Sequence, residues 1–272
     1  AVAEPLRDLA SLKQATNPAR LRALEKMLEA RGIPYERQTF SSAATPHGRT
    51  RGTNLIVTFG TGGREITLGA HYDALELPEG GLVDGMIDNG ASTIILVRIA
   101  EALRGTDPHH RVRIVFFDME ETGFAGSQAY VAAGKSDIAA AVILDIAGFG
   151  DSLGYGTGKS GNSAAIRKAL LASCAEQLLT CLDSPNYPSS DDRSFQNAGI
   201  PVVSLGFFPR LTTIQTWLLL NGGAQSGLRE GFVPPRIQDH THARGQPRPD
   251  RAGRDRTGIP ARARHAAASR RL

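Results

Sequence analysis

The segment RVRIVFFDMEETG, residues 111–123, decides how this chain folds. Its first part, Arg111 to Phe117, is a largely apolar run of the kind that forms an interior strand of a β-sheet. Three carboxylates follow within four residues, at Asp118, Glu120 and Glu121. Packed like charges repel one another and resist desolvation unless cations or shared protons offset them. This cluster therefore either extends into water or faces a metal ion.

The rest of the chain alternates strand-like and helix-like runs, which indicates a layered α/β fold. Near-continuous apolar strands separated by helices are typical of a sheet that is covered on both faces. In such sheets, functional side chains gather at the carboxyl ends of the strands. The predicted strands are Asn54–Phe59, Glu65–Ala70, Arg111–Phe117, Ala140–Leu144 and Ile200–Phe207, and the predicted helices are Pro18–Arg31, Ala91–Leu103 and Ser163–Leu179.

The net charge of +4 hides two different parts of the chain. Residues 243–272 hold nine arginines and two aspartates, and subtracting their +7 leaves −3 for residues 1–242. A basic chain normally suggests a nucleic-acid partner, but here the basic charge belongs to a tail, so we predict none. No apolar run approaches the ~18 residues of a membrane span, so we predict no membrane partner either. We expect residues 1–242 to form a single domain.

Cys174 and Cys181 lie seven residues apart in the run LLASCAEQLLTC. If this run is helical throughout, two turns separate the thiols by ~10 Å, which is too far for a disulfide. A bridge requires the helix to end before Cys181, which residues 183–185 (Asp-Ser-Pro) allow. We favour two buried thiols. An exported protein with a processed N-terminus and a cytoplasmic protein both fit the sequence.

Four separate segments bring an acid or a histidine to the predicted sheet edge. His71 and Asp73 follow the run EITLGA, Asp88 lies in the loop GLVDGMIDNGAS, the 118–121 cluster follows its strand, and Asp145 ends AAVILD. Each has an ordinary explanation alone, such as a surface turn, a helix cap or a solvated pair. All four explanations would have to hold together, so we favour a metal site.

The chemistry of these groups suits zinc. Carboxylate and imidazole bind Zn²⁺, and a carboxylate can bridge two ions. Two ions ~3.5–4 Å apart polarise a carbonyl and acidify the attacking water, whose proton a neighbouring carboxylate must accept. One of the adjacent residues Glu120 and Glu121 can bind metal while the other accepts the proton, because neighbouring side chains point in different directions. Asp73 lies on the same strand face as His71 and is placed to accept its ring N–H.

Five segments together resemble the co-catalytic zinc aminopeptidases, of the leucyl aminopeptidase and aminopeptidase Y type. The glutaminyl cyclases are single-zinc relatives of these enzymes. The resemblance runs in order from about residue 18 to residue 208. It rests on HYD (71–73), GMIDNGAS (85–92), RVRIVFFDMEETGFAGSQAYV (111–131), VILDIAG (142–148) and SDDRSFQNAGIPVVSLG (190–206).

This resemblance implies a mixed, largely parallel sheet between helices, and two zinc ions. It also implies a zinc-dependent aminopeptidase that hydrolyses the N-terminal residue of peptides with a free N-terminus. The implied metal ligands are His71 and Asp145 for the first ion, Asp88 as the bridge and Glu121 for the second ion, with Glu120 as general acid/base and Asp73 as the support of His71. The alternatives are a single-zinc enzyme of the glutaminyl cyclase type and a catalytically impaired binding homologue.

The chain departs from the family pattern in two places before its tail. Ile87 stands where an acidic residue often precedes the Asp-Asn pair, which alters the loop but removes no ligand. Asp192 replaces a pocket histidine, which affects substrate preference. Phe207, Phe208 and residues 217–220 are apolar and either line a pocket or belong to the core.

The last zinc ligand of the family comes from a carboxyl-terminal segment. Here residues 238–242 (QDHTH) arrive at that point, so His240 is the predicted ligand, with His242 as the alternative. The following residues include only Ile259 and Leu272 as large aliphatic side chains and cannot bury a helix face. We interpret residues 243–272 as an out-of-frame tail or a natural unstructured one. If the tail does not hold the histidine, one zinc ion is expected instead of two.

Overall fold

The computed structural model describes residues 3–134, 136–158, 162–232 and 234. The described residues up to Pro234 belong to one unit. The predicted domain boundary at residue 242 and the tail interpretation fall outside the described residues and stay predictions.

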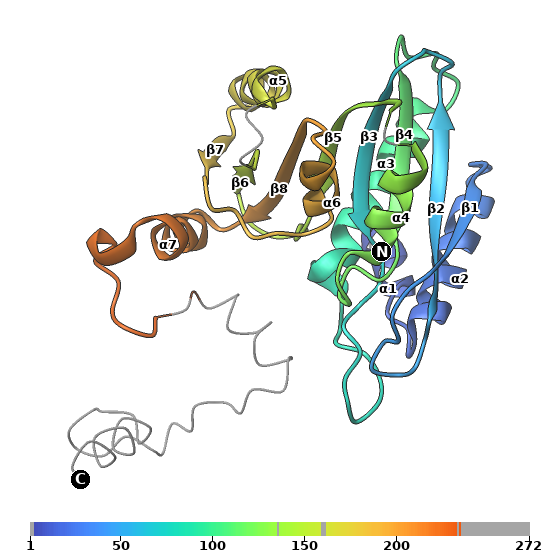
Figure 1. Ribbon diagram of the computed structural model, residues 1–272, viewed down its shortest axis with the longest axis horizontal. Helices are drawn as coiled ribbons and strands as arrows, with labels where there is room; N and C mark the ends of the chain where they lie inside the picture. Colours follow the sequence, from blue (N-terminus) through green and yellow to red (C-terminus); the bar gives the residue numbers. More distant parts are fainter. Residues whose placement is uncertain (1–2, 135, 159–161, 233, 235–272) are drawn as a thin grey trace. The chain divides into compact units, whose positions relative to one another are not determined.

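Within the described residues, eight strands form one sheet in the order β1-β2-β4-β3-β5-β8-β6-β7 (Figure 1). The four central strands, β4, β3, β5 and β8, run parallel to one another, while β2 and β6 join them antiparallel. This confirms the predicted mixed, largely parallel sheet. The strands are β1 Glu36–Ser41, β2 Arg51–Phe59, β3 Glu65–His71, β4 Arg111–Phe117, β5 Ile138–Leu144, β6 Ser152–Gly156, β7 Thr180–Asp183 and β8 Val202–Phe208.

Helices pack against both faces of the sheet. Because side chains alternate across a strand, Ile114 and Phe116 of β4 join one core with α2 and α3, while Val115 and Phe117 join a second core with α4 and α6. No helix in the described part of the chain has the length and apolar character needed to cross a membrane. The helices are α1 Glu4–Ser11, α2 Asn17–Ala30, α3 Ala91–Leu103, α4 Ala125–Gly134, α5 Ala164–Glu176, α6 Asp192–Asn197 and α7 Arg210–Asn221, with a π-helical turn η1 Met86–Gly90 and a 3-10 turn η2 Gly223–Gln225.

Helix α2 shows why the local sequence starts and stops where it does. The side chain of Thr16 caps its first turn by accepting a hydrogen bond from the N–H of Ala19, 3.3 Å away, and Pro18 occupies the first turn. Proline is tolerated there because the first turn has no partner for its missing N–H. The helix ends at Ala30, and Gly32 follows with a φ of 60°, a conformation that glycine adopts without strain.

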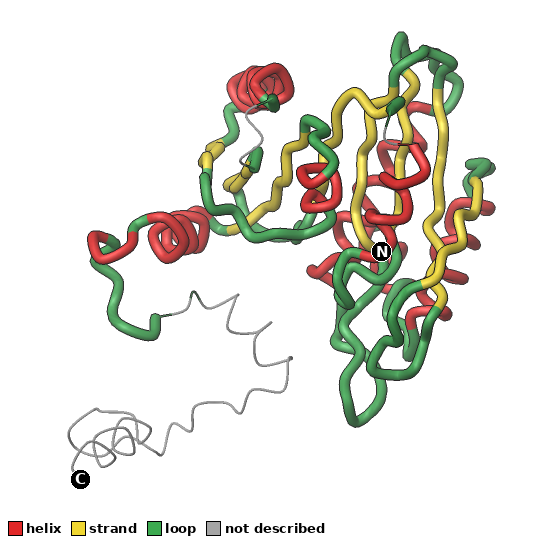
Figure 2. Tube along the Cα trace, in the orientation of Figure 1, coloured by secondary structure: helices red, strands yellow, loops and turns green. Residues whose placement is uncertain are grey.

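The strand register brings the predicted site residues to one level of the sheet. His71 at the end of β3 pairs with Phe117 at the end of β4, directly before Asp118. Gly69 pairs with Ile143 of β5. Counting two residues onward on each strand therefore places His71 beside Asp145. Figure 2 shows the loops that leave these strands as green tubes.

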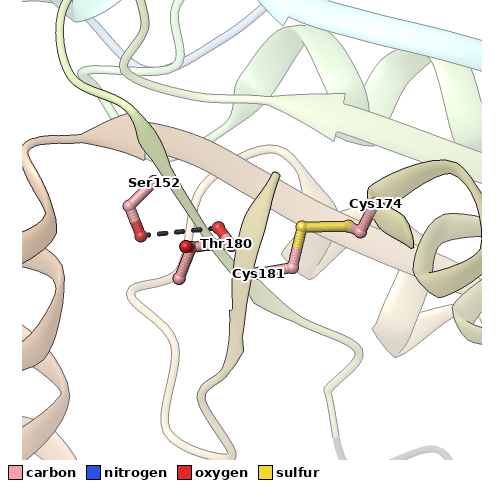
Figure 3. The surroundings of a disulfide bond; sticks show 4 residues. All are labelled: Ser152, Cys174, Thr180 and Cys181. Atoms are coloured by element: carbon pink, nitrogen blue, oxygen red, sulfur yellow. Dashed lines mark hydrogen bonds between the residues drawn. A yellow bond between two sulfur atoms is a disulfide. The ribbon is translucent and has the colours of Figure 1, made fainter. Parts of the chain in front are cut away.

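The interpretation of two free thiols is wrong, because Cys174 and Cys181 form a disulfide (Figure 3). Helix α5 was expected to continue to Leu179, but it ends at Glu176. Cys181 therefore lies on β7, and the Cα atoms of the two cysteines are 6.3 Å apart instead of two helical turns. Cys174 is the buried residue of α5, so the bridge fastens a helix that buries little else.

We expect loss of this disulfide to destabilise the protein. Closing a loop of this size stabilises a fold by about 2 to 3 kcal/mol, mainly by restricting the unfolded chain. A Cys174→Ser/Cys181→Ser variant should lose that much free energy of unfolding, measured by urea denaturation. Reductant should lower the stability of the wild-type protein in the same way and leave the double variant unchanged. An equal stability of both proteins would contradict the assigned bridge.

Candidate metal centre

His71 is the centre of the site and is almost completely buried, with 1% of its side chain exposed. Its Nε2 lies 3.2 Å from Asp88 Oδ1, 3.7 Å from Asp145 Oδ1 and 4.0 Å from Glu120 Oε2. On the other side of the ring, Nδ1 lies 3.1 Å from the main-chain oxygen of Asp73 and 3.5 Å from its carboxylate. One imidazole therefore meets acidic groups delivered by four separate segments.

The surroundings of His71 favour a positive charge at this point. Burial lowers the pKa of the imidazole, but the carboxylates of Glu120, Asp145, Asp73 and Asp88 outweigh this effect and raise the pKa well above its ordinary value. A divalent cation bound at this point would offset the charge of the surrounding carboxylates.

The atoms that remain unpartnered fit a zinc ion. His71 Nε2 and Asp145 Oδ1 are buried and make no hydrogen bond of acceptable geometry within the described residues. Ligand atoms of His71, Glu120 and Asp145 all lie within 4.8 Å of one another. Buried polar atoms are nearly always satisfied in native proteins, so these two indicate a missing partner. One nitrogen and carboxylate oxygens are a suitable zinc donor set.

The loop that carries Asp88 is fixed to the end of β5 by its neighbour Asn89. The amide of Asn89 donates to the carbonyl of Leu144 at 2.8 Å, and its oxygen accepts from the N–H of Ile146 at 3.2 Å. The side chain of Asn89 therefore does not cap helix α3, and Gly90 occupies the N-cap position without a side-chain hydrogen bond. These two bonds fix Leu144 and Ile146, the neighbours of Asp145, and they bring the loop that carries Asp88 next to Asp145.

Glu120 has the environment of a proton carrier. Burial raises the pKa of its carboxyl well above the ordinary value, and the charges of Asp145, Asp191 and Glu121 act in the same direction, while His71 opposes them. A raised pKa brings a carboxyl closer to the range in which it exchanges protons at neutral pH. The predicted role of Glu120 as general acid/base is compatible with this placement and stays a prediction.

Asp73 has more contacts than the sequence predicted. Its carboxylate accepts hydrogen bonds from the main-chain N–H of Glu120 at 3.1 Å and of Glu121 at 3.3 Å. It thus fixes the turn that presents both glutamates, while its main-chain oxygen is closer to the His71 ring than its carboxylate is. Glu121 does not belong to the group of three potential ligands, so its predicted role at a second ion stays a prediction.

The carboxylate of Asp118 is bound by groups that lie outside the candidate metal site. It accepts from Arg49 Nη1 at 2.7 Å and from the N–H of Thr53 at 2.9 Å. The first carboxylate of the opening cluster therefore joins the end of β4 to β2 and to the loop that precedes β2.

Asp191 is a site residue that the sequence did not single out. It is fully buried, and neither carboxylate oxygen makes a hydrogen bond of acceptable geometry among the described residues. Burial raises its pKa to about 7, although the charge of His71 opposes the shift. The only signal in the sequence was its place beside Asp192 in the run SDD.

A cavity of about 520 Å³ lies next to this site, and its lining includes Tyr187, Asp192 and Gln196. A Cβ on Gly206 would lie 2.5 Å from the main-chain oxygen of Asp145 and 2.8 Å from the Tyr187 hydroxyl, so Tyr187 links the cavity to the Asp145 loop. Asp192 accepts from the N–H of Ser190 at 2.8 Å and from the amide of Gln196. The lining is polar and does not include the apolar residues at 207–208 and 217–220.

His240 and His242 lie outside the described residues. The choice between them, the second zinc ion that either would help to bind and the number of ions are therefore not tested by the structure.

The sequence profile of peptidase family M28 matches residues 54–233. No curated protein sequence matches the chain. Solved structures of similar fold include a glutaminyl cyclase from an Acidobacteriales bacterium, with a TM-score of 0.60 and 20% identity over 76% of this chain and 78% of that one.

Two aminopeptidases share the fold as well. The LapA aminopeptidase of Legionella pneumophila gives a TM-score of 0.59 and 19% identity over 75% of this chain and 60% of that one. BSAP, a zinc aminopeptidase from Bacillus subtilis, gives 0.52 and 22% over 60% and 42%. At these identities, the structures establish the fold alone.

We expect the stability of the metal-free protein to fall as the pH rises from about 4 to about 6. Burial raises the pKa of Asp192 from 3.8 to about 6, although the Ser190 N–H opposes the shift. Between these values the folded state holds a proton that the unfolded chain releases, so folding loses about 1 to 3 kcal/mol over this interval. An Asp192→Asn variant should lose this part of the pH dependence in chelator-treated samples, while Asp191, whose pKa is raised to about 7, keeps its own contribution.

Chemical denaturation at several pH values would measure the effect. Asp107→Asn, at an exposed position, is the control and should keep the wild-type slope. A variant at Asp192 that also keeps the wild-type slope would show that another group causes it.

Proposed function

The chain belongs to peptidase family M28, and from this premise we propose that it is a zinc-dependent aminopeptidase that removes the N-terminal residue from peptides. The observation that carries the proposal is the buried imidazole of His71, whose Nε2 has no hydrogen-bond partner among the described residues and faces carboxylates from three other segments. Family membership supports a zinc-dependent hydrolase, and the choice of an aminopeptidase rests on the residues of the site.

We infer that His71, Asp88 and Asp145 would hold one zinc ion and that Asp88 and Glu121 would hold a second. A bound zinc ion supplies a Lewis acid that polarises the scissile carbonyl and lowers the pKa of a water molecule. Asp73 contributes indirectly by orienting the His71 ring and by holding the main chain of Glu120 and Glu121.

Glu120 carries the proton in the proposed reaction. Its carboxylate accepts a proton from the attacking water as the water oxygen bonds to the carbonyl carbon of the first peptide group. The carbon–nitrogen bond then breaks, and Glu120 returns the proton to the leaving amine. The products are a free amino acid and a peptide shortened by one residue. The buried, acidic surroundings that raise the Glu120 pKa suit this exchange.

A second candidate is a glutaminyl cyclase, which the polar cavity favours. The cavity beside Asp145 is lined by amide and charged groups, including Asn186, Asp192 and Gln196. Such groups can hydrogen-bond an N-terminal glutamine side chain. In that reaction the substrate α-amine attacks its own side-chain amide carbon, ammonia leaves, and Glu120 transfers the proton between the two nitrogens. The known cyclase structures of similar fold agree with this alternative.

Two substrates and a zinc assay separate these candidates. Release of p-nitroaniline from leucyl-p-nitroanilide by zinc-loaded protein supports the aminopeptidase, and formation of pyroglutamate from a peptide with N-terminal glutamine supports the cyclase. Metal analysis of the same samples gives the number of ions per chain. A protein that binds zinc and converts neither substrate would overturn both candidates and favour a binding homologue.

We predict that Glu120→Gln lowers kcat by about 100-fold to 10,000-fold, the usual contribution of a general acid or base. Zinc content should stay at the wild-type level, because the amide cannot accept the proton but the predicted ligands remain. Glu79→Gln, on an exposed loop, is the matched control and should keep full activity. Unchanged turnover in Glu120→Gln would refute the assigned role.

A further inference from the structure

Arg20 is completely buried in the first turns of helix α2, although arginine is rarely found there. Its guanidinium donates three hydrogen bonds, each to a main-chain carbonyl. Nε bonds to Tyr72 at 2.7 Å, Nη1 to Leu12 at 2.9 Å and Nη2 to Gly85 at 3.0 Å. One side chain thus joins the end of α1, the end of β3 and the loop before η1.

Asn17, one turn earlier on the same helix, makes a second set of contacts. Its amide donates to the carbonyl of Ala74 at 2.9 Å, and its oxygen accepts from the N–H of Ala74 at 2.9 Å. With 3% of its surface exposed, Asn17 makes these bonds away from water. The main-chain N–H and carbonyl of Ala74, in the loop after β3, are therefore both hydrogen-bonded to the side chain of Asn17.

Apart from Leu12 at the end of α1, the carbonyls that Arg20 and Asn17 bind belong to the segments that carry the candidate ligands. Tyr72 lies between His71 and Asp73, and Ala74 follows directly. The second segment is the Gly85–Gly90 loop, which contains Asp88. The carbonyl of Gly85 accepts from both Arg20 and the N–H of Gly90, so the loop is closed on itself and tied to α2 at the same atom.

The packing at Gly85 shows how closely the loop approaches the guanidinium. Gly85 has a φ of 61°, and a Cβ at this position would lie 2.9 Å from Arg20 Nη1 and 2.6 Å from the Cβ of Ala74. Any larger residue would push the loop away from both. The glycine therefore allows the Asp88 loop to lie directly against the His71 segment.

Charge also connects Arg20 to the site. Burial lowers the pKa of the guanidinium, while the charges of Asp73, Asp84 and Asp88 support it. A guanidinium stays protonated in proteins, so a fixed positive charge lies behind the ligand carboxylates. A role in packing alone would not require a charged side chain, because an apolar one of similar size avoids the desolvation of the charge.

We propose that Arg20 and Asn17 are positioning residues of the metal site. They hold the 71–74 segment and the Gly85–Gly90 loop in the relative placement at which His71 and Asp88 bind the same ion. This inference rests on the proposed function, since it takes these two residues as zinc ligands. The alternative is that Arg20 and Asn17 merely attach α1 and α2 to the sheet.

The two explanations differ in what they predict for the folded protein. A positioning residue controls the affinity of the folded state for zinc, whereas an attachment controls only the free energy of unfolding. Replacement of the residues that orient metal ligands typically weakens metal binding by 10- to 100-fold. Zinc affinity and stability therefore have to be measured on the same variants.

The test uses the full chain and three variants, Arg20→Lys, Asn17→Ala and Leu24→Ala. Arg20→Lys keeps the charge but cannot reach three carbonyls at once. Leu24→Ala is the control, since Leu24 is buried on the same helix and belongs to the apolar core. Zinc affinity is measured by competition with a chromophoric chelator, and the melting temperature is measured on the metal-free proteins.

We expect Arg20→Lys to bind zinc 10- to 100-fold more weakly than the wild-type protein. Asn17→Ala should show a smaller loss, and Leu24→Ala should melt at a lower temperature while binding zinc within twofold of wild type. If Arg20→Lys does not fold, Asn17→Ala decides the question. Wild-type zinc affinity in both site variants would overturn the inference and leave the proposed function intact. A wild-type protein that binds no zinc would refute the proposed function, and the inference with it.

Discussion

At the carboxyl ends of the central parallel strands, negative charge accumulates around one buried imidazole. His71, at the end of β3, lies within 4.0 Å of carboxylates from η1, from the turn after β4 and from the residue after β5. This arrangement favours a positive charge, which a bound zinc ion would supply. Other features of the fold serve to hold the arrangement in place: the strand register aligns the segments, Asn89 fixes one loop to β5, and Asp73 fixes the turn that bears Glu120.

The elements that could be predicted are those in which the apolar residues of the local sequence are also the residues buried in the fold. Strand β4 and helix α3 have the predicted bounds because their apolar runs are long and end in polar residues. Strand β1 was missed because its sequence, ERQTFS, is polar and its side chains are mostly exposed, so its pairing with β2 comes from tertiary structure. The disulfide was misjudged because helix α5 ends three residues earlier than expected.

The sequence predicted those residues of the candidate site that directly follow a strand. His71 and Asp145 were found this way, because strand ends in a parallel sheet converge whatever the side chains elsewhere do. Arg20 and Asn17 could not be found, since a helical pattern gives no reason to look for an arginine whose hydrogen bonds all go to distant carbonyls. Asp191 was missed for a related reason: an acidic pair at the start of a short helix resembles an ordinary solvated one, and only the fold shows that it is buried.

The position of Arg20 and Asn17 in the chain also affects how the functional unit should be delimited. The match to the family begins at residue 54, after β1 and within β2, whereas the two side chains that hold the ligand segments come from residues 17 and 20. A recombinant fragment cut at the start of the match would keep the ligands after β3, β4 and β5 but lose the helix behind them. On the proposed roles of Arg20 and Asn17, the metal-binding unit is longer than the range matched by the family profile, and its amino-terminal limit is set by a helix that contributes no ligand.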